Sequence, residues 1–367
     1  MFLYQGPVKE LDDKFVTLIG KFVADIKHGK IRGSTNRVLA MVTLLETIIT
    51  ESQYTTAVDL CGAIRAAGRQ VMAALPNELV IANVARRLLR AIRDENRAQG
   101  NQGIEGSGES LQRLVLAASA RRATLGTAQH DLREPLRDYI AELRGELESS
   151  ISSICGQARE HVHGDELILT YGASPITERF LRAAAPRKYK LILAEGPDPT
   201  EEFYSELTVL IAEWSQSHAM ANRLSAAGVP VTVISAASIY AVMSRVNKVV
   251  ISVKAALGGG AILSEAGVFS VTLAARHYRV PVLALVPLYK LCPIHDLTPF
   301  NSSGSPHTAL SYDHHEATSD NVHVYAPLYD FAPPDNVTLF ITNLGGSSPS
   351  YMYRMLSELY DPSDYLL

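Results

Sequence analysis

Residues 249–267 read VVISVKAALGGGAILSEAG, and this stretch carries the pattern that decides the fold. Its apolar run predicts a buried strand, its glycine triplet predicts a tight turn, and a helix is expected to begin at Ser264. A strand, a glycine turn and a helix in that order form the usual phosphate-binding loop of α/β proteins. The first question is therefore whether this loop binds or transforms a phosphorylated ligand.

Apolar runs of the same kind recur on both sides of this stretch, from Gly164 onward. Between them lie segments of roughly ten to fifteen residues with helical periodicity. The runs are ELILTY, KLILAE, VPVTVIS, KVVISV, VPVLALV and VTLFIT. Such alternation predicts repeated βαβ units, and so an α/β fold class with a Rossmann-like domain and a mainly parallel sheet over residues 164–367.

Upstream of this region the apolar residues recur at helical spacing, as in DKFVTLIGKFVADI, and strand patterns are missing. Glycines at 29 and 33 and Pro76 separate the helical segments. We expect an N-terminal helical bundle domain over residues 1–127, with a flexible polar loop at residues 99–110. A connecting helix is expected over residues 128–163.

The composition indicates a soluble protein with a large core. Hydrophobic residues make up 47% of the 367 residues, and no stretch has the features of a signal peptide or a membrane span. A net charge of -4 argues against bulk electrostatic binding to nucleic acid. Cys61, Cys155 and Cys292 show no disulfide or metal-ligand spacing. We therefore expect a cytoplasmic protein without a metal site.

The glycine triplet and Lys254 are the candidate residues of an anion site. Backbone amides at Gly258, Gly259 and Gly260 could hold a phosphate, and Lys254 ends the preceding apolar strand. The triplet fits neither G-x-G-x-x-G nor the P-loop, so a plain tight turn is the alternative. Because no acid, base and nucleophile gather here, no catalytic residue and no cofactor are assigned.

Four arginines predict a basic face on one helix. Arg86, Arg90, Arg93 and Arg97 follow at steps of four, three and four residues, which places them on one side. They could dock an acidic or phosphorylated partner. The alternative is a solvated face whose charges pair locally, for example with Asp94.

Longer motifs carry a family resemblance over nearly the whole chain. These are QSHAMANRLSAAGVPVTVIS, SIYAVMSRVNKVVISVKAALGGGAILSEAG and NLGGSSPSYMYRMLSELYDPSDYLL. The sequence resembles the regulatory subunits of eukaryotic translation initiation factor 2B, and VMSRVNKV and SELYDPSDYLL match the beta type rather than the alpha and delta types. The segment 196–216 and the region around Tyr312 depart from the family pattern.

The resemblance implies a non-catalytic, regulatory and scaffolding subunit of the complex that exchanges GDP for GTP on initiation factor 2. Its partners would be the alpha, gamma, delta and epsilon subunits in a two-fold symmetric decamer, with the exchange chemistry in epsilon. Initiation factor 2 would be a further partner, because the regulatory subunits sense phosphorylation of its alpha subunit. Neither nucleic acid nor a membrane is expected as a direct partner.

The resemblance also suggests which residues contact other subunits. Aromatic and arginine side chains often anchor such interfaces, although the tyrosines could equally pack the last helix onto the sheet. The candidates are His218, Asn343, Gly345, Gly346, Tyr351, Tyr353 and Arg354.

The same superfamily includes isomerases of methylthioribose 1-phosphate and ribose 1,5-bisphosphate, so an aldose–ketose isomerase is the alternative function. These enzymes carry a catalytic cysteine after the first strand of the domain and an aspartate after the fourth. The matching positions here are Gly172 and Lys254. A cationic lysine does not replace a carboxylate in proton transfer, which disfavours catalysis. A nucleotide- or sugar-phosphate-binding sensor is a third reading.

Overall fold

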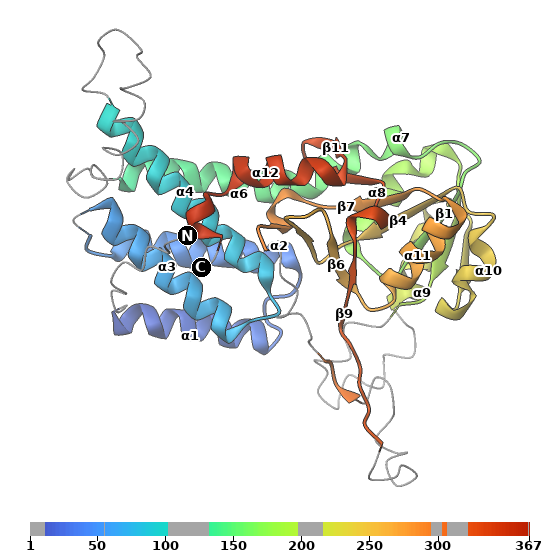
Figure 1. Ribbon diagram of the computed structural model, residues 1–367, viewed down its shortest axis with the longest axis horizontal. Coiled ribbons are helices and arrows are strands. Elements are labelled where there is room, and N and C mark those ends of the chain that lie inside the picture. The colour runs from blue at the N-terminus through green and yellow to red at the C-terminus, as the bar shows by residue number, and fades with distance from the viewer. Residues whose placement is uncertain are drawn as a thin grey trace. The chain divides into compact units, whose positions relative to one another are not determined.

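The computed structural model describes residues 12–54, 56–101, 132–196, 216–294, 303–306, 322–365 and 367. Its contacts divide the chain into two compact units, one made of Met1–Glu148 with Ser357–Leu367 and the other of Ser149–Leu356 (Figure 1). Most of the expected polar loop and of the region around Tyr312 lies outside the described residues. No helix in the described part of the chain is long and apolar enough to cross a bilayer.

The first unit is helical, as the periodicity predicts. Its inward positions recur every three or four residues, as Phe15, Ile19 and Phe22 do in the first helix. Thr56 and Asp59 form a capping box that fixes the start of the third helix. Its helices are α1 (Asp13–Lys27), α2 (Ser34–Glu51), α3 (Ala57–Ala74), α4 (Leu79–Asn101) and the first part of α6 (Arg133–Gly156).

The last residues of the chain belong to this helical unit. The expected division gave residues 164–367 to one domain, whereas the contacts assign Ser357–Leu367 to the helices. This C-terminal segment contains the end of α12 (Met352–Leu359) and the short 3-10 helix η12 (Pro362–Asp364). The change of unit also falls inside α6, after Glu148, rather than at the end of the connecting helix.

The second unit confirms the Rossmann-like α/β prediction. A seven-stranded sheet has the order β11-β10-β7-β4-β1-β2-β3, and all neighbours except β10 and β11 pair in parallel. The strands are β1 (Leu167–Tyr171), β2 (Lys190–Ala194), β3 (Val231–Ile234), β4 (Lys248–Ser252), β7 (Val282–Leu285), β10 (Leu339–Thr342) and β11 (Gly345–Ser347).

Helices cover this sheet. Apolar side chains of three helices and of the end of α6 share a core with Ile168, Val250 and Ile341 of the strands. Val249 and Ile251 alternate with Val250 and are buried too, so both faces of the sheet are covered. The helices of this unit are α7 (Ala158–His161), α8 (Pro175–Ala184), α9 (Gln216–Ala226), α10 (Ile239–Met243) and α11 (Val268–Tyr278).

A second, four-stranded sheet corrects the expected helix start at Ser264. That residue lies in a strand, which pairs with its predecessor across the glycine triplet, and helix α11 begins only after Gly267. The triplet therefore joins two strands of a hairpin rather than a strand and a helix. The sheet has the order β8 (Leu291–Cys292), β5 (Ala255–Leu257), β6 (Ile262–Glu265), β9 (Tyr329–Ala332).

Candidate functional site

The strand order defines where a ligand would bind in such a fold. From β1 the chain proceeds to β2 and β3 on one side, and it then returns to place β4 on the other side of β1. Ligands of doubly wound sheets occupy the crevice beyond the carboxyl ends of the strands at this reversal. The residues that matter are therefore those that follow Tyr171 on β1 and Ser252 on β4.

The side chain of Tyr171 lies at this crevice and packs on glycines. Its hydroxyl donates a hydrogen bond to the carbonyl of Ala266 at 2.7 Å. A Cβ atom on Gly267 would lie 1.9 Å from the Tyr171 hydroxyl oxygen, and one on Gly196 would lie 3.1 Å from ring atom Cε1. The tyrosine therefore fills space that only glycine neighbours can provide.

Gly172 follows directly, in a backbone conformation that favours glycine. Its φ of +67° lies in the left-handed region, and a Cβ atom there would lie 2.9 Å from Oε2 of Glu265. A cysteine at this position would meet both backbone strain and a carboxylate. The correspondence of Gly172 with the catalytic cysteine of the isomerases stays a prediction from the resemblance.

The amides at the start of α11 are already occupied. The carboxylate of Asp330, on β9, accepts hydrogen bonds from the backbone nitrogens of Gly267 at 2.7 Å and Phe269 at 3.1 Å. A helix start next to a glycine is where a Rossmann fold usually holds a phosphate. Here the protein supplies its own anion at that place.

The electrostatics of the crevice disfavour proton transfer by Tyr171. Burial, together with the negative charges of Glu265 and Asp330, raises the pKa of Tyr171 to about 12. The phenol therefore keeps its proton at neutral pH and acts as a hydrogen-bond donor. Among the described residues, no group of three or more His, Cys, Asp or Glu side chains could hold a metal ion.

In the predicted anion turn, the backbone amides of Gly258 and Gly260 donate hydrogen bonds to carbonyl groups of the protein itself. The backbone nitrogen of Gly258 donates to the carbonyl of Ile294 at 3.3 Å, and that of Gly260 donates to Leu257 at 2.8 Å. Gly260 has a φ of +80°, and a Cβ there would lie 2.7 Å from the carbonyl oxygen of Pro349. Gly259 is exposed. The triplet is shaped by this close packing rather than by a ring of free amides.

Lys254 lies beside an aromatic ring. Its ammonium nitrogen is 5.4 Å from the centroid of the Tyr329 ring, a cation–π distance, and its backbone nitrogen bonds to Leu263. The lysine side chain therefore contacts β9. Because an ammonium group cannot accept a proton, Lys254 cannot act as the base that an aspartate would provide at this position.

Comparisons with known proteins agree with a full-length resemblance. The model of the initiation factor 2 subunit family matches residues 30–349. The chain belongs to the initiation factor 2 subunit family. It is 32% identical to the eIF2B beta subunit of Schizosaccharomyces pombe, over 95% of this chain and 97% of that protein. The expected relationship is thereby confirmed.

Solved structures of family members show the same fold. The crystal structure of eIF2B beta from Chaetomium thermophilum has 25% identity and a TM-score of 0.68, and covers 96% of this chain and 93% of that one. A chain of the tetrameric eIF2B-beta2-delta2 complex of the same organism has 26% identity and a TM-score of 0.69, with 94% and 95% covered. The likeness includes both the helical and the α/β unit.

Several of the predicted contact residues of this family member are exposed: Gly346 on β11, Tyr351 in the 3-10 helix η11 (Pro349–Tyr351), and Tyr353 and Arg354 on α12. Tyr353 is 66% and Tyr351 is 42% exposed, and the guanidinium of Arg354 stacks 5.6 Å from the Tyr351 ring. Gly345, with a φ of +126°, makes the turn into β11, where Gly346 is exposed. These side chains therefore do not serve mainly to pack the last helix.

Asn343 and His218 lie elsewhere and have internal partners. The side-chain oxygen of Asn343 accepts a hydrogen bond from the backbone of Leu288 at 3.0 Å, so it supports the unit's own structure. His218 lies on α9, and its Nε2 is 3.3 Å from Oε1 of Glu195. Helix α9 packs against β2 and β3, at the opposite end of the sheet from β11.

The arginine face of α4 proves to be divided. Arg86 is 1% exposed and donates hydrogen bonds to the carbonyls of Asp364 and Tyr365, both at 3.2 Å. Arg93 is buried as well and holds the Asp364 carboxylate with both Nη atoms. A docking role needs exposed guanidinium groups, so these two arginines are not available for it.

Arg90 and Arg97 remain on the surface. Arg97 pairs with Asp94 at 3.2 Å, as the local-pairing alternative expects. Arg90 also contacts Asp94, at 3.4 Å, and donates to the carbonyl of Ser357 at 2.8 Å. Three of the four arginines therefore contact the C-terminal segment, and the fourth, Arg97, lies in solvent beside Asp94.

Sequence reasoning missed Asp364, the residue that organises this cluster. Its side chain has no exposed surface and also pairs with Arg65 at 2.7 Å. Asp361 caps η12 through Ser363 and lies 3.5 Å from Arg93. Burial would raise the pKa of Asp361, but hydrogen bonds from Ser363 and the nearby arginine charges outweigh it and lower that pKa. The two aspartates in DPSDYLL were the feature of the sequence that could have indicated acidic partners for these arginines.

Proposed function

We propose that this protein is the regulatory, non-catalytic beta-type subunit of the guanine-nucleotide-exchange complex that acts on translation initiation factor 2. The observation that carries the proposal is the crevice at the strand reversal. It is filled by Tyr171, its helix amides are held by Asp330, and Gly172 has a left-handed backbone conformation at which any side chain would also displace the Glu265 carboxylate. A subunit that binds proteins rather than transforms a sugar phosphate fits such a site.

The partners follow from the resemblance to eIF2B beta subunits over the whole chain. We expect the alpha, gamma, delta and epsilon subunits, in a two-fold symmetric decamer with the exchange chemistry in epsilon, acting in the cytoplasm. The exposed face of Tyr351, Tyr353 and Arg354 supports this proposal, because accessible aromatic and arginine side chains anchor many subunit interfaces.

The helical unit is the expected contact with initiation factor 2 and its phosphorylated alpha subunit. On α4, Arg90 and Arg97 are the arginines that stay accessible, with side chains 33% and 51% exposed. A phosphate brought near them would compete with Asp94 for the same guanidinium groups. The docking face would then be smaller than the four-arginine spacing predicts.

Reconstitution tests the proposal. The chain is co-expressed with the other four subunit types, the mass of the purified assembly is measured, and GDP release from initiation factor 2 is followed with unmodified and phosphorylated substrate. We expect a stable assembly whose inhibition by phosphorylation weakens when this chain is left out. Isolation of the chain as a monomer that joins no assembly would refute the proposal, as would rapid turnover of methylthioribose 1-phosphate or ribose 1,5-bisphosphate by the purified chain.

A further inference from the structure

Helix α11 carries large apolar side chains on its outer side as well as on its inner side. Val268, Val271 and Ala275 face inward and are buried. On the outer side, Phe269 and Leu273 are 36% and 43% exposed, although both are large apolar side chains. A helix on the surface of a soluble unit normally turns polar side chains outward, so this outer face has the composition of a covered one.

Helix α10 extends the apolar face. Residues 269, 273 and 277 of α11 follow at steps of four and therefore share one side. The ring of His277 lies 5.4 Å from that of Tyr240 on α10, which is itself 5.2 Å from the ring of Tyr278. Tyr240 is 52% exposed. The aromatic face thus comprises Tyr240, Phe269, Leu273, His277 and Tyr278.

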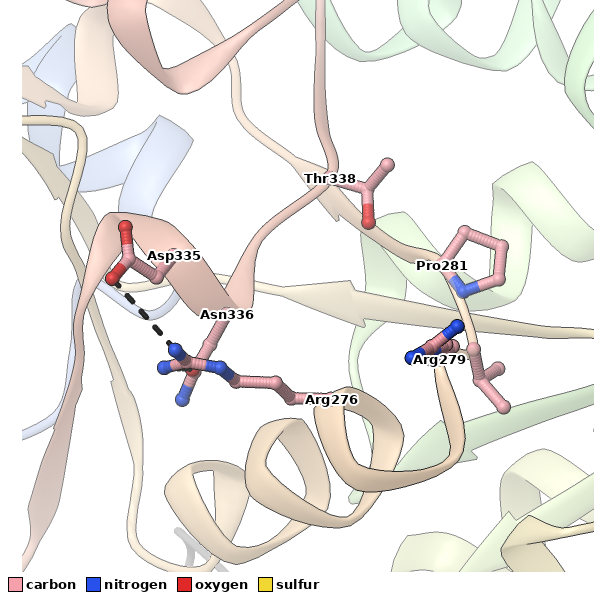
Figure 2. A pocket seen from close by; sticks show the side chains of 7 residues that line it. Arg276, Arg279, Pro281, Asp335, Asn336 and Thr338 are labelled. Atoms are coloured by element: carbon pink, nitrogen blue, oxygen red, sulfur yellow. Dashed lines mark hydrogen bonds and ion pairs between the residues drawn. The ribbon is translucent and has the colours of Figure 1, made fainter.

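A basic pocket opens beside the aromatic face, at the C-terminal end of α11 (Figure 2). It has a volume of about 260 Å³, and Arg276, Arg279, Asp335, Asn336 and Thr338 contribute to its walls. Figure 2 shows Arg276 reaching toward Asp335 and Asn336, with Arg279 apart from them next to Pro281. The pocket therefore combines two guanidinium groups with one carboxylate.

The two arginines are engaged to different degrees. Arg276 donates a hydrogen bond to the side-chain oxygen of Asn336 at 3.2 Å and lies 4.0 Å from the Asp335 carboxylate. The Arg279 side chain makes no hydrogen bond or ion pair with any residue that the structure describes. Its backbone has a φ of +56°, at the end of α11. One guanidinium is thus left for a ligand from outside.

The charged side chains on α10 and α11 themselves are all arginines. Residues 236–247 and 268–279, which form α10, α11 and their ends, contain Arg245, Arg276 and Arg279 and no aspartate or glutamate. A surface with an apolar centre and a basic rim is complementary to an apolar surface with acidic groups at its edge. The occupant is therefore expected to carry carboxylates.

We propose that the aromatic face and the basic pocket together dock a different subunit, through an apolar patch whose edge places a carboxylate beside Arg279. The inference rests on the proposed function, because that function supplies partner subunits. A second copy of this chain is the less suitable occupant. An isologous contact centred on α11 brings the same residues of two copies together, so that the basic rims would face each other.

The test uses the full chain co-expressed with the other four subunit types. Leu273→Asp and Tyr240→Ser alter the aromatic face, and Arg279→Glu reverses the free charge of the pocket. Tyr325→Ser and Arg179→Glu are the matched controls, because both side chains are exposed and lie outside α10 and α11. Sedimentation velocity measures assembly, and thermal unfolding of each isolated variant checks that it folds.

We expect the face variants and Arg279→Glu to weaken assembly by about tenfold or more, as removal of an interface anchor does. The controls and Arg279→Lys should assemble like the unchanged chain. Hydrogen exchange in residues 268–279 should slow on assembly. If folded face variants assemble normally, the docking surface is refuted while the proposed function stands. If only self-association changes, the different-subunit occupant is refuted, and if the unchanged chain joins no assembly, the proposed function itself fails.

Discussion

Replacing Asp364 by alanine should destabilise the helical unit by about 3–5 kcal/mol, the usual cost of removing one partner from a buried ion pair. The Asp364 side chain is 0% exposed and accepts hydrogen bonds from Nη2 of Arg65 at 2.7 Å and Nη2 of Arg93 at 2.8 Å. Those two guanidinium groups, only 24% and 10% exposed, would lose their counterion. The cost arises mainly from leaving these cations buried.

Asp94 provides the matched control within the same unit. It also pairs with two arginines, Arg90 at 3.4 Å and Arg97 at 3.2 Å, but its side chain is 52% exposed. Water screens these pairs, so Asp94→Ala should cost less than about 1 kcal/mol. The two substitutions remove the same chemical group, and burial alone separates their expected effects.

Urea unfolding followed by far-UV circular dichroism measures the difference, with thermal unfolding as a second method. For a unit of this size, 3–5 kcal/mol lowers Tm by roughly 6–20 °C. Hydrogen exchange should speed up in α3 and α4, which carry the arginines. The double variant Arg93→Met with Asp364→Ala should cost less than the sum of the single changes, by about 0.5–3 kcal/mol. A loss from Asp364→Ala no larger than that from Asp94→Ala would refute the reasoning.

Three further predictions concern the α/β unit. Gly267→Ala should lower the free energy of unfolding by about 1–3 kcal/mol or more, because a Cβ atom would lie 1.9 Å from the Tyr171 hydroxyl at a φ of +104°; urea unfolding checks this, and a neutral result would mean that Tyr171 lies elsewhere. Asp330→Ala should cost about 0.5–2 kcal/mol through the lost cap of α11, and faster hydrogen exchange in the first turn of that helix should accompany it. Burial lowers the pKa of His161 despite the opposing charge of Glu160, so the unfolded chain takes up the proton first, and stability should be complete above about pH 6.5 and fall as the pH decreases below it. His161→Gln should flatten that decrease, and an unchanged pH profile would contradict the assignment.

The periodicity of the sequence was sufficient for the main sheet and the helical unit. Runs such as KVVISV and VPVLALV are long and apolar because both faces of a central parallel strand are buried. Strands β6 (ILSE) and β9 (YDFA) contain charged residues, and β5 and β8 have only three and two residues, so none of them forms a separate apolar run of that kind. Ser264 looked like a helix start because serine is a common N-cap, but it pairs with Asp330 across two strands.

The arginine face shows a different limit. Spacing correctly placed Arg86, Arg90 and Arg93 near one side of a helix, but spacing cannot tell whether that side meets solvent or another part of the chain. The deciding partner, Asp364, is separated from Arg93 by 271 positions in sequence. A single sequence does not show which distant residues are in contact. The structure does, because it places the buried Asp364 carboxylate among guanidinium groups.

The glycines at the crevice connect these observations to function. In a nucleotide- or phosphate-binding Rossmann fold, glycines at strand ends let a ligand approach the backbone. Here Gly196 and Gly267 let the Tyr171 ring approach instead, and Asp330 takes the helix amides that a phosphate would need. A ligand would have to displace both a buried aromatic ring and an internal carboxylate. The crevice therefore has the backbone geometry of a ligand site but is filled by the protein's own side chains. Recognition of partners is then expected at the outer faces of the helices.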